Sequence, residues 1–173
     1  MIYRAYYAFI RAPRMNSRGE NTSAIFGFVV TLEDLLKRIK PSHIAVAFDP
    51  AGPTFRHEAF ELYKAQRQET PEDIRWAVPR IKQILQAMNI PVLEVPGYEA
   101  DDVIGTIAYK AESQGFEVYM ATPDKDYGQL VTEHIFMYRP RHTGGSEKLG
   151  PQEVCDKYGI QNQRQVIDLL ALM

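Results

Sequence analysis

Apolar residues in the first forty positions recur at intervals of three and four, which is the spacing of a helix with one buried face. This face comprises Ile25, Phe28, Val29, Leu32, Leu36 and Ile39. Asn21, Thr22 and Ser23 precede it and can cap the first helical N–H groups, while Pro41 cannot continue the helix. The pattern therefore predicts a helix that begins near Ser23 and ends before Pro41.

Three largely apolar runs of strand length follow, and the continuous first run suits a parallel sheet that is covered on both faces. They occupy residues 43–48, 90–95 and 116–121. Helical patterns lie between them, from Thr70 and Pro71 to residue 88 and from Glu99 to Gln114. Because strands alternate with helices, we predict an α/β fold with a mainly parallel central sheet flanked by helices.

The last third of the chain predicts a short helix after Asp126, a weaker strand at residues 135–138 and two terminal helices. Residues 139–148 contain Pro140, Gly144 and Gly145, and we expect them to form a mobile loop. No repeat or linker interrupts the pattern. We therefore treat residues 1–173 as a single domain.

Composition narrows the class of protein. The chain has 173 residues, 45% of them hydrophobic, and a net charge of −2 at pH 7. A single cysteine, Cys155, cannot form an internal disulfide, and no signal peptide is recognisable, so we expect a cytoplasmic protein. No apolar run approaches the roughly 20 residues that cross a bilayer. Because the overall charge weakly repels phosphate, nucleic-acid binding requires a local basic patch or a bound metal.

Acidic residues gather where the predicted strands end. The acids at three successive strand ends are Asp49, then Glu99, Asp101 and Asp102, then Asp124 and Asp126. Ligands of parallel α/β sheets bind beyond the carboxyl ends of the strands. We expect these carboxylates to converge there, and a bound cation would relieve the repulsion between them.

Acids in the first turn of a helix also complement the helix dipole, for roughly 0.3–1 kcal/mol each, without any ligand. That interpretation suffices for Glu72 and Asp73. It stays open for the group around Glu99 alone and for the pair around Asp124 alone, but the combination of both favours a metal site. Oxygen ligands without a matching His or Cys set favour Mg²⁺ or Mn²⁺ over zinc.

The spacing of the acids also suggests how many ions they serve. Glu99 and Asp102 share a face of the predicted helix while Asp101 points elsewhere, so the motif can serve two neighbouring metal positions. Two ions ~4 Å apart can activate a water and stabilise the leaving oxygen of an in-line displacement. The arrangement predicts phosphodiester hydrolysis, with Asp49 at the catalytic edge of the sheet.

Residues 54–67 predict a helix that carries basic residues. Lys64 and Arg67 lie three positions apart on one face, and the ring of Tyr63 beside them can stack on a base. An ordinary solvated helix face would explain the same pattern. Because the segment follows a strand-end aspartate, we favour contacts of Arg56, Lys64 and Arg67 with substrate phosphates, with Lys64 or Arg67 stabilising transition-state charge.

A second aromatic and basic segment lies at the start of the chain. It contains Tyr3, Arg4, Tyr6 and Tyr7. Arg4 is a candidate nucleic-acid contact, although the tyrosine spacing favours a helix that packs its rings into the core.

Several segments together resemble the N-terminal 5′ nuclease domain of bacterial DNA polymerase I, in the family's order and over nearly the whole chain. They are residues 2–9, 46–49, 52–57, 63–67, 97–102 and 124–126. The run Gly-Tyr-Glu-Ala-Asp-Asp that ends at Asp102 is highly specific, whereas Asp-Lys-Asp ending at Asp126 would mean little alone.

The resemblance implies a PIN-like fold related to flap endonucleases. In that family, acidic residues at the matching positions bind two metal ions, and the segment matching residues 63–67 contacts the substrate strand. The implied activity is removal of 5′ ends, 5′ flaps and RNA primers on DNA, at the bacterial nucleoid during replication and repair. A polymerase domain would follow at the C-terminal side.

Two departures shape the expectation. The family places a strand ending in a ligand aspartate before the segment matching Ile2, and continues beyond residue 173 into Gly-Asp-Ser-x-Asp-Asn and a helix-hairpin-helix clamp. We therefore expect a partial nuclease core with most of one metal site and part of a second. The alternatives are a DNA-binding fragment without catalysis and another acidic α/β metal domain such as a Toprim-like one, against which residues 63–67 argue.

Overall fold

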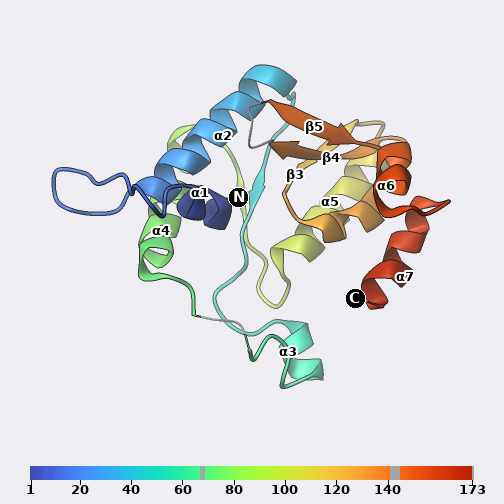
Figure 1. Cartoon of the computed structure of the whole chain (residues 1–173), viewed down its shortest axis with the longest axis horizontal. Coiled ribbons are helices and arrows are strands. Elements are labelled where there is room, and N and C mark those ends of the chain that lie inside the picture. Colours follow the sequence, from blue (N-terminus) through green and yellow to red (C-terminus); the bar gives the residue numbers. More distant parts are fainter. Residues whose placement is uncertain (67–68, 141–144, 173) are drawn as a thin grey trace. The chain divides into compact units, whose positions relative to one another are not determined.

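The computed structural model describes residues 1–66, 69–140 and 145–172 and divides the chain into two compact units, Met1–Glu99 and Ala100–Met173. Figure 1 shows the order of the helices and strands along the chain. Each unit has its own hydrophobic core. The assignment of residues 1–173 to one domain stays a prediction.

The first unit packs helices around a short parallel ladder. Its elements are α1 (Ile2–Ala8), α2 (Ser23–Ile39), β1 (Val46–Ala47), α3 (Phe55–Ala59), α4 (Glu72–Ala87) and β2 (Val92–Leu93). The core comprises Ala24, Phe28, Leu32, Phe48, Ala77, Ile81, Leu85 and Ile90. It includes the face of α2 that the hydrophobic spacing predicted, which confirms that helix.

The ends of α2 follow from side-chain and backbone chemistry. The Asn21 Oδ1 accepts a hydrogen bond from the backbone N–H of Ser23 at 3.1 Å, and Lys40 ends the helix in a left-handed conformation with φ 50°. Within the helix, Gly27 permits close packing against α1, because a Cβ there would lie 2.8 Å from the Cβ of Ala5.

The strands of this unit are shorter than predicted. Residues 43–48 and 90–95 were expected to form full strands, but only Val46 pairs with Val92 and Ala47 with Leu93. The backbone N–H of Val46 donates to the carbonyl of Pro91 at 2.9 Å. Pro91 has no N–H to return, so it limits how far the ladder extends.

The second unit is built on a three-stranded sheet. Its elements are α5 (Ala100–Ser113), β3 (Val118–Ala121), η1 (Lys125–Leu130), β4 (Ile135–Pro140), β5 (Ser146–Leu149), α6 (Pro151–Tyr158), η2 (Gln163–Gln165) and α7 (Val166–Ala171). The strand order is β3-β4-β5, with β3 and β4 parallel and β4 and β5 antiparallel. The core includes Met120, Val131, Ile135, Met137, Leu149, Val154 and Val166.

The prediction of a loop over residues 139–148 is wrong for part of its length. Residues 146–149 form β5, in which Leu149 is buried opposite Met137 of β4. Three polar residues followed by a single leucine show no alternation, so the pattern of this segment does not distinguish a strand from a loop. Residues 141–144 of the predicted mobile loop lie outside the described residues.

The α/β class is confirmed, but the strands of the described residues form two ladders of two and three strands rather than one central sheet. In the part of the chain that the structure describes, no helix combines the length and apolar character needed to cross a membrane.

Candidate metal and nucleic-acid site

Glu99 is a buried carboxylate surrounded by donors from the segment that precedes α4. Only 7% of its surface is exposed. Lys64 Nζ lies 2.5 Å from Oε1, the Tyr63 hydroxyl donates to Oε2 at 3.1 Å, and Arg56 Nη1 lies 3.5 Å from Oε2. The structure therefore brings three predicted nucleic-acid contacts together on one predicted metal ligand.

These partners keep Glu99 ionised. Burial alone raises the pKa of a carboxyl group, because it penalises the charged form. Here hydrogen bonds from Lys64 and Tyr63, with the positive charges of Lys64 and Arg56, outweigh burial and hold the pKa of Glu99 below its usual range. Glu99 is thus a carboxylate whose charge is already compensated by cations.

The segment that carries the donors is anchored at its start. Thr54 is buried and its backbone N–H donates to His57 Nδ1 at 3.2 Å, in a capping box that opens α3. The Phe55 N–H donates to the carbonyl of Gly97 at 2.9 Å, and the Phe55 ring packs on Tyr98. Gly97 has φ 83°, which glycine adopts without strain.

The expected basic helix over residues 54–67 is wrong beyond Ala59. Phe60 is extended with φ −147°, and Lys64 is left-handed with φ 57°. A helix needs an apolar face to bury, whereas Phe60 and Leu62 are 60% and 69% exposed. Lys64 therefore does not occupy a helical face, and Arg67 lies outside the described residues.

Tyr63 has partners on both its ring and its hydroxyl. Its ring meets the His57 ring edge-on at a centroid distance of 5.2 Å, while its hydroxyl binds Glu99. His57 was not a predicted site residue. Its role as cap and ring contact depends on the turn after α3, which hydrophobic spacing does not reveal.

Asp49 follows β1 and Arg4 lies in α1, while their metal and nucleic-acid roles stay predictions. Asp49 is exposed and follows β1, as expected for a strand-end acid. Arg4 lies half-buried in α1. Core packing by the tyrosines of α1 is confirmed for Tyr6, but Tyr3 and Tyr7 are 47% and 52% exposed.

In the second unit, Asp124 and Asp126 stand in the turn after β3. Asp124 caps η1: its Oδ1 accepts a hydrogen bond from the backbone N–H of Asp126 at 3.0 Å. The Asp124 N–H in turn donates to Thr122 Oγ1 at 3.1 Å. Both carboxylates are exposed, and the partners identified for Asp124 are neutral groups of the same turn.

The other acids of this unit begin α5. Asp101 and Asp102 lie in its first turn, and Glu99 directly precedes the helix instead of belonging to it. The expectation that Glu99 and Asp102 share a face stays a prediction. The Tyr127 hydroxyl donates to Asp101 Oδ1 at 2.6 Å. This bond joins η1 to the start of α5, while the predicted convergence of the carboxylates themselves stays a prediction.

The sequence did not predict that two residues lie beside the turn that carries Asp124 and Asp126. Tyr127 looks like an ordinary core aromatic, and Arg139 Nη2 donates to the carbonyl of Pro123 at 2.8 Å, just before Asp124. Burial and the nearby charges of Asp126 and Asp124 raise the pKa of Tyr158, while Arg139 opposes the rise. No sequence spacing relates β4 or α6 to this turn.

Across residues 1–66, 69–140 and 145–172, no group of three or more His, Cys, Asp or Glu side chains lies close enough together to hold a metal ion. The donors are all hard oxygens, which suits a divalent cation such as Mg²⁺. The metal roles of the six predicted acids therefore stay predictions.

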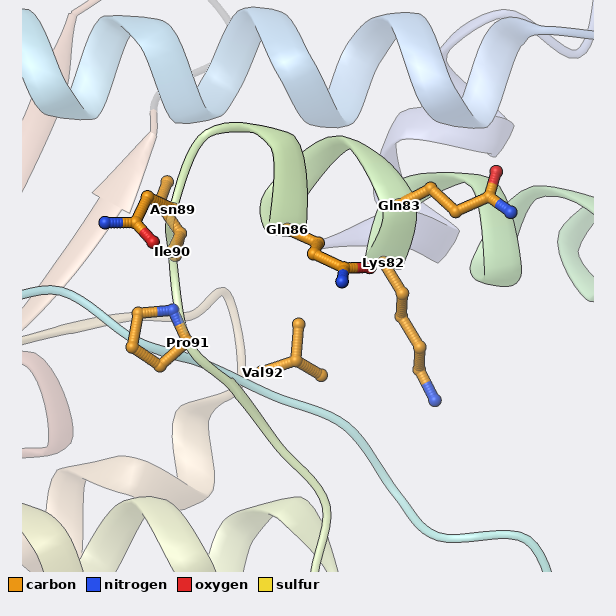
Figure 2. A pocket seen from close by; sticks show the side chains of 7 residues that line it. All are labelled: Lys82, Gln83, Gln86, Asn89, Ile90, Pro91 and Val92. Atoms are coloured by element: carbon orange, nitrogen blue, oxygen red, sulfur yellow. The ribbon is translucent and has the colours of Figure 1, made fainter.

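A cavity of about 430 Å³ lies at the C-terminal end of α4. It is lined by Lys82, Gln83, Gln86, Asn89, Ile90, Pro91 and Val92 (Figure 2). Lys82 pairs with Glu94 at 2.6 Å. None of the predicted site residues lines this cavity, so it does not bear on the acidic site.

The fold and the acidic strand ends point to a nuclease class, and comparison with known proteins defines it. The chain belongs to the family described as the N-terminal, resolvase-like domain of 5′-3′ exonucleases, whose model matches residues 1–159. This confirms the family that the motifs predicted.

Two relatives are similar to nearly the whole of this chain. The chain is 40% identical to a DNA polymerase I of Bacillus caldotenax over 171 residues, covering 98% of this chain and 19% of the relative. It is 38% identical to a 5′-3′ exonuclease of Aquifex aeolicus over 172 residues, covering 99% of this chain and 57% of that relative. The chain thus spans about a fifth to three fifths of these relatives.

A solved structure supports the fold. The bacteriophage T5 flap endonuclease, in a pseudo-enzyme–product complex with DNA and metal ions, matches with a TM-score of 0.68 at 20% identity. The match covers 98% of this chain and 64% of that chain. At this identity the likeness establishes the fold, which agrees with the predicted 5′ nuclease architecture.

Proposed function

We propose that this chain is the nuclease part of a metal-dependent 5′→3′ exonuclease and flap endonuclease. The observation that carries the proposal is the contact of Lys64, Tyr63 and Arg56 with the buried carboxylate of Glu99. Two cationic side chains therefore lie beside a carboxylate of the run that ends at Asp102, which supports a role for them in binding phosphate. Positive groups at that place can stabilise the charge that builds up on a transferring phosphate.

The proposed metal ligands are the six acids that follow the predicted strands. They are Asp49, Glu99, Asp101, Asp102, Asp124 and Asp126. Their oxygens suit Mg²⁺, and Mn²⁺ can substitute because it accepts the same ligands. These residues would hold two ions, which would supply the chemistry of activating a water and stabilising the leaving oxygen of an in-line displacement.

The protein's own residues hold and orient the substrate. Arg56, Lys64 and Arg67 bind phosphates of the scissile strand, and the Tyr63 ring offers a surface on which a base can stack. Arg4 adds a phosphate contact from α1. Lys64 Nζ has three N–H donors, so it can contact a phosphate as well as Glu99.

The proposed substrates are DNA with 5′ ends or 5′ flaps and RNA primers on DNA. Relatives named DNA polymerase I support a role in replication and repair at the bacterial nucleoid, with a polymerase domain at the C-terminal side. The T5 neighbour, described with DNA and metal ions, supports both the substrate class and the cofactor class.

A labelled-substrate assay tests the proposal. A duplex with a 5′-labelled 5′ flap is incubated with the protein and Mg²⁺, with EDTA and a 3′-flap duplex as controls. We expect metal-dependent release of the 5′ flap alone. Cleavage that persists in EDTA, or equal cleavage of both flaps, would overturn the proposal.

One observation favours a second function, DNA binding without catalysis. Lys64 occupies the Glu99 carboxylate, and no three acids converge among the described residues. This alternative predicts that the protein binds the 5′-flap duplex but leaves it intact in both Mg²⁺ and Mn²⁺. That result would replace the nuclease proposal.

A further inference from the structure

Tyr127 connects the two acidic segments of the second unit. Its side chain is 5% exposed, and its hydroxyl donates to Asp101 Oδ1 at 2.6 Å. Tyr127 directly follows Asp126 in η1, which Asp124 caps. The buried Tyr127 side chain is therefore next to Asp124 and Asp126 in sequence and hydrogen-bonded to Asp101.

The surroundings of Tyr127 hold its hydroxyl in place. The ring belongs to the core cluster that includes Val131, Ile135 and Val154, so packing restricts its position. The backbone of η1 is fixed by the Asp124 cap and by Gln129, whose side-chain amide donates to the Asp126 carbonyl at 2.9 Å. Packing of the ring and hydrogen bonding of the η1 backbone therefore fix the position from which the hydroxyl binds Asp101.

Asp101 itself lies on the surface in the first turn of α5. An exposed aspartate samples several rotamers, and ordering it costs conformational entropy. A hydrogen bond to Oδ1 fixes the plane of the carboxylate and so fixes the direction of Oδ2. Hydrogen bonds of this kind orient metal-ligating carboxylates, and their loss typically weakens metal affinity about 10- to 100-fold.

We propose that Tyr127 is a positioning residue that pre-orients Asp101 for a divalent cation. This inference rests on the proposed function, in which Asp101 is a metal ligand. The phenol suits the task because it orients the carboxylate without bringing a positive charge that would repel the ion. A lysine or arginine at the same place would compete with the metal.

Tyr127→Phe tests the inference, because it removes one hydroxyl and keeps the ring in the core. Tyr138→Phe is the matched control: Tyr138 is also 5% exposed in the same unit, and its hydroxyl accepts a hydrogen bond from Ser146 Oγ rather than binding an acid. Thermal unfolding reports any general loss of stability in the two variants.

The decisive readouts are binding of Mn²⁺ to the protein alone, followed by electron paramagnetic resonance, and the Mg²⁺ concentration that gives half-maximal flap cleavage. For Tyr127→Phe we expect both the Mn²⁺ dissociation constant and the Mg²⁺ midpoint to rise about tenfold. The cleavage rate at saturating Mg²⁺ should stay within about threefold of wild type. Tyr138→Phe should leave both metal readouts unchanged.

Unchanged metal readouts in Tyr127→Phe, or equal shifts in both variants, would overturn the inference. If wild-type cleavage remained Mg²⁺-dependent in that case, the proposed function would stand and only the role of Tyr127 would fall. Absence of Mn²⁺ binding to the wild-type protein would overturn both.

Discussion

Glu99 and Asp124 are both predicted metal ligands, yet the protein holds them with opposite kinds of partner. Glu99 is buried and paired with Lys64 at 2.5 Å and Arg56 at 3.5 Å. Asp124 is exposed and receives a neutral backbone N–H from Asp126 at 3.0 Å. A cation that approaches Glu99 meets the positive charges of Lys64 and Arg56, whereas the hydrogen bonds described for Asp124 come from and go to neutral groups.

The difference in partners implies different roles for the two carboxylates. A buried carboxylate needs a compensating charge, and removing one partner of such a pair leaves the other at a cost. An exposed carboxylate held by an amide keeps its full charge for an incoming ion. We therefore expect Asp124 to provide intrinsic metal affinity and Glu99 to respond to whether Lys64 is engaged elsewhere.

The largest effect should come from Asp124→Asn. Asparagine caps a helix about as well as aspartate, so η1 should persist while the negative charge is lost. Because a direct ligand matters at least as much as its outer partners, we expect the Mg²⁺-dependent flap cleavage rate to fall about 100-fold or more. Quenched time courses at fixed Mg²⁺ measure this change.

Asp168→Asn is the matched control for that experiment, since Asp168 is an exposed acid in the first turn of α7. It should cleave at the wild-type rate. A wild-type rate for Asp124→Asn would remove Asp124 from the metal site.

Lys64→Ala should produce two effects of opposite sign. Without Lys64, Glu99 loses its nearest cation, so the Mn²⁺ affinity of the free protein should rise about three- to tenfold, on the order of 1 kcal/mol. Flap cleavage should fall about 100-fold, because a group that stabilises transition-state charge is lost. Paramagnetic Mn²⁺ titration and cleavage rates measure the two effects on the same sample.

Lys37→Ala controls for the loss of a lysine that has no role in the site. The Lys37 side chain is 75% exposed and forms a surface ion pair with Glu33. It should change neither quantity. Weaker Mn²⁺ binding by Lys64→Ala would show that Lys64 does not compete with the metal at Glu99.

Glu99→Gln should destabilise the first unit in a pH-dependent way. Removing the charge leaves Lys64 and Arg56 without their buried partner, at a cost of about 1–3 kcal/mol at pH 7. The pKa of Glu99 is lowered in the folded protein, so its stabilisation is complete above the unfolded value of about 4.3 and is lost as the pH falls through the folded value.

Urea unfolding of wild type and Glu99→Gln at a series of pH values measures this linkage. The gap in the free energy of unfolding should be largest near neutral pH and should narrow below pH ~4.3. A gap that stays constant down to pH ~2 would contradict the ion-pair origin of the stabilisation.

The smallest effect should come from Thr54→Val, which removes a hydroxyl from the capping box of α3. We expect a loss of about 1 kcal/mol in the free energy of unfolding and a decrease in cleavage of less than about threefold. Thr54→Ser keeps the hydroxyl and should restore both. Failure of serine to restore stability would indicate that Thr54 acts through packing instead.

The same two regions show what could be predicted from sequence. Asp49 and Asp124 were placed correctly because acids after a continuous apolar strand must emerge at its carboxyl end. The conformation of the segment around Lys64 was predicted incorrectly. Its residues have helical spacing but no buried apolar face, and the helix ends at Ala59. The fold class could be predicted from the sequence. The strand pairing could not, because β1 and β2 have only two residues each.

Tyr127 marks the limit of sequence reasoning in the second unit. A tyrosine at the end of an acidic turn has the same pattern whether its hydroxyl meets water or an aspartate. Only the packing of η1 against α5 determines that it meets Asp101. Interactions between elements that are distant in sequence decide such contacts, and local spacing carries no record of them.

Calorimetric titration of Mg²⁺ into the wild-type protein, Asp124→Asn and Lys64→Ala tests most directly whether Asp124 binds the metal and whether Lys64 opposes metal binding at Glu99. We predict weaker binding in Asp124→Asn and tighter binding in Lys64→Ala. Identical Mg²⁺ affinities in all three proteins would contradict the assignment.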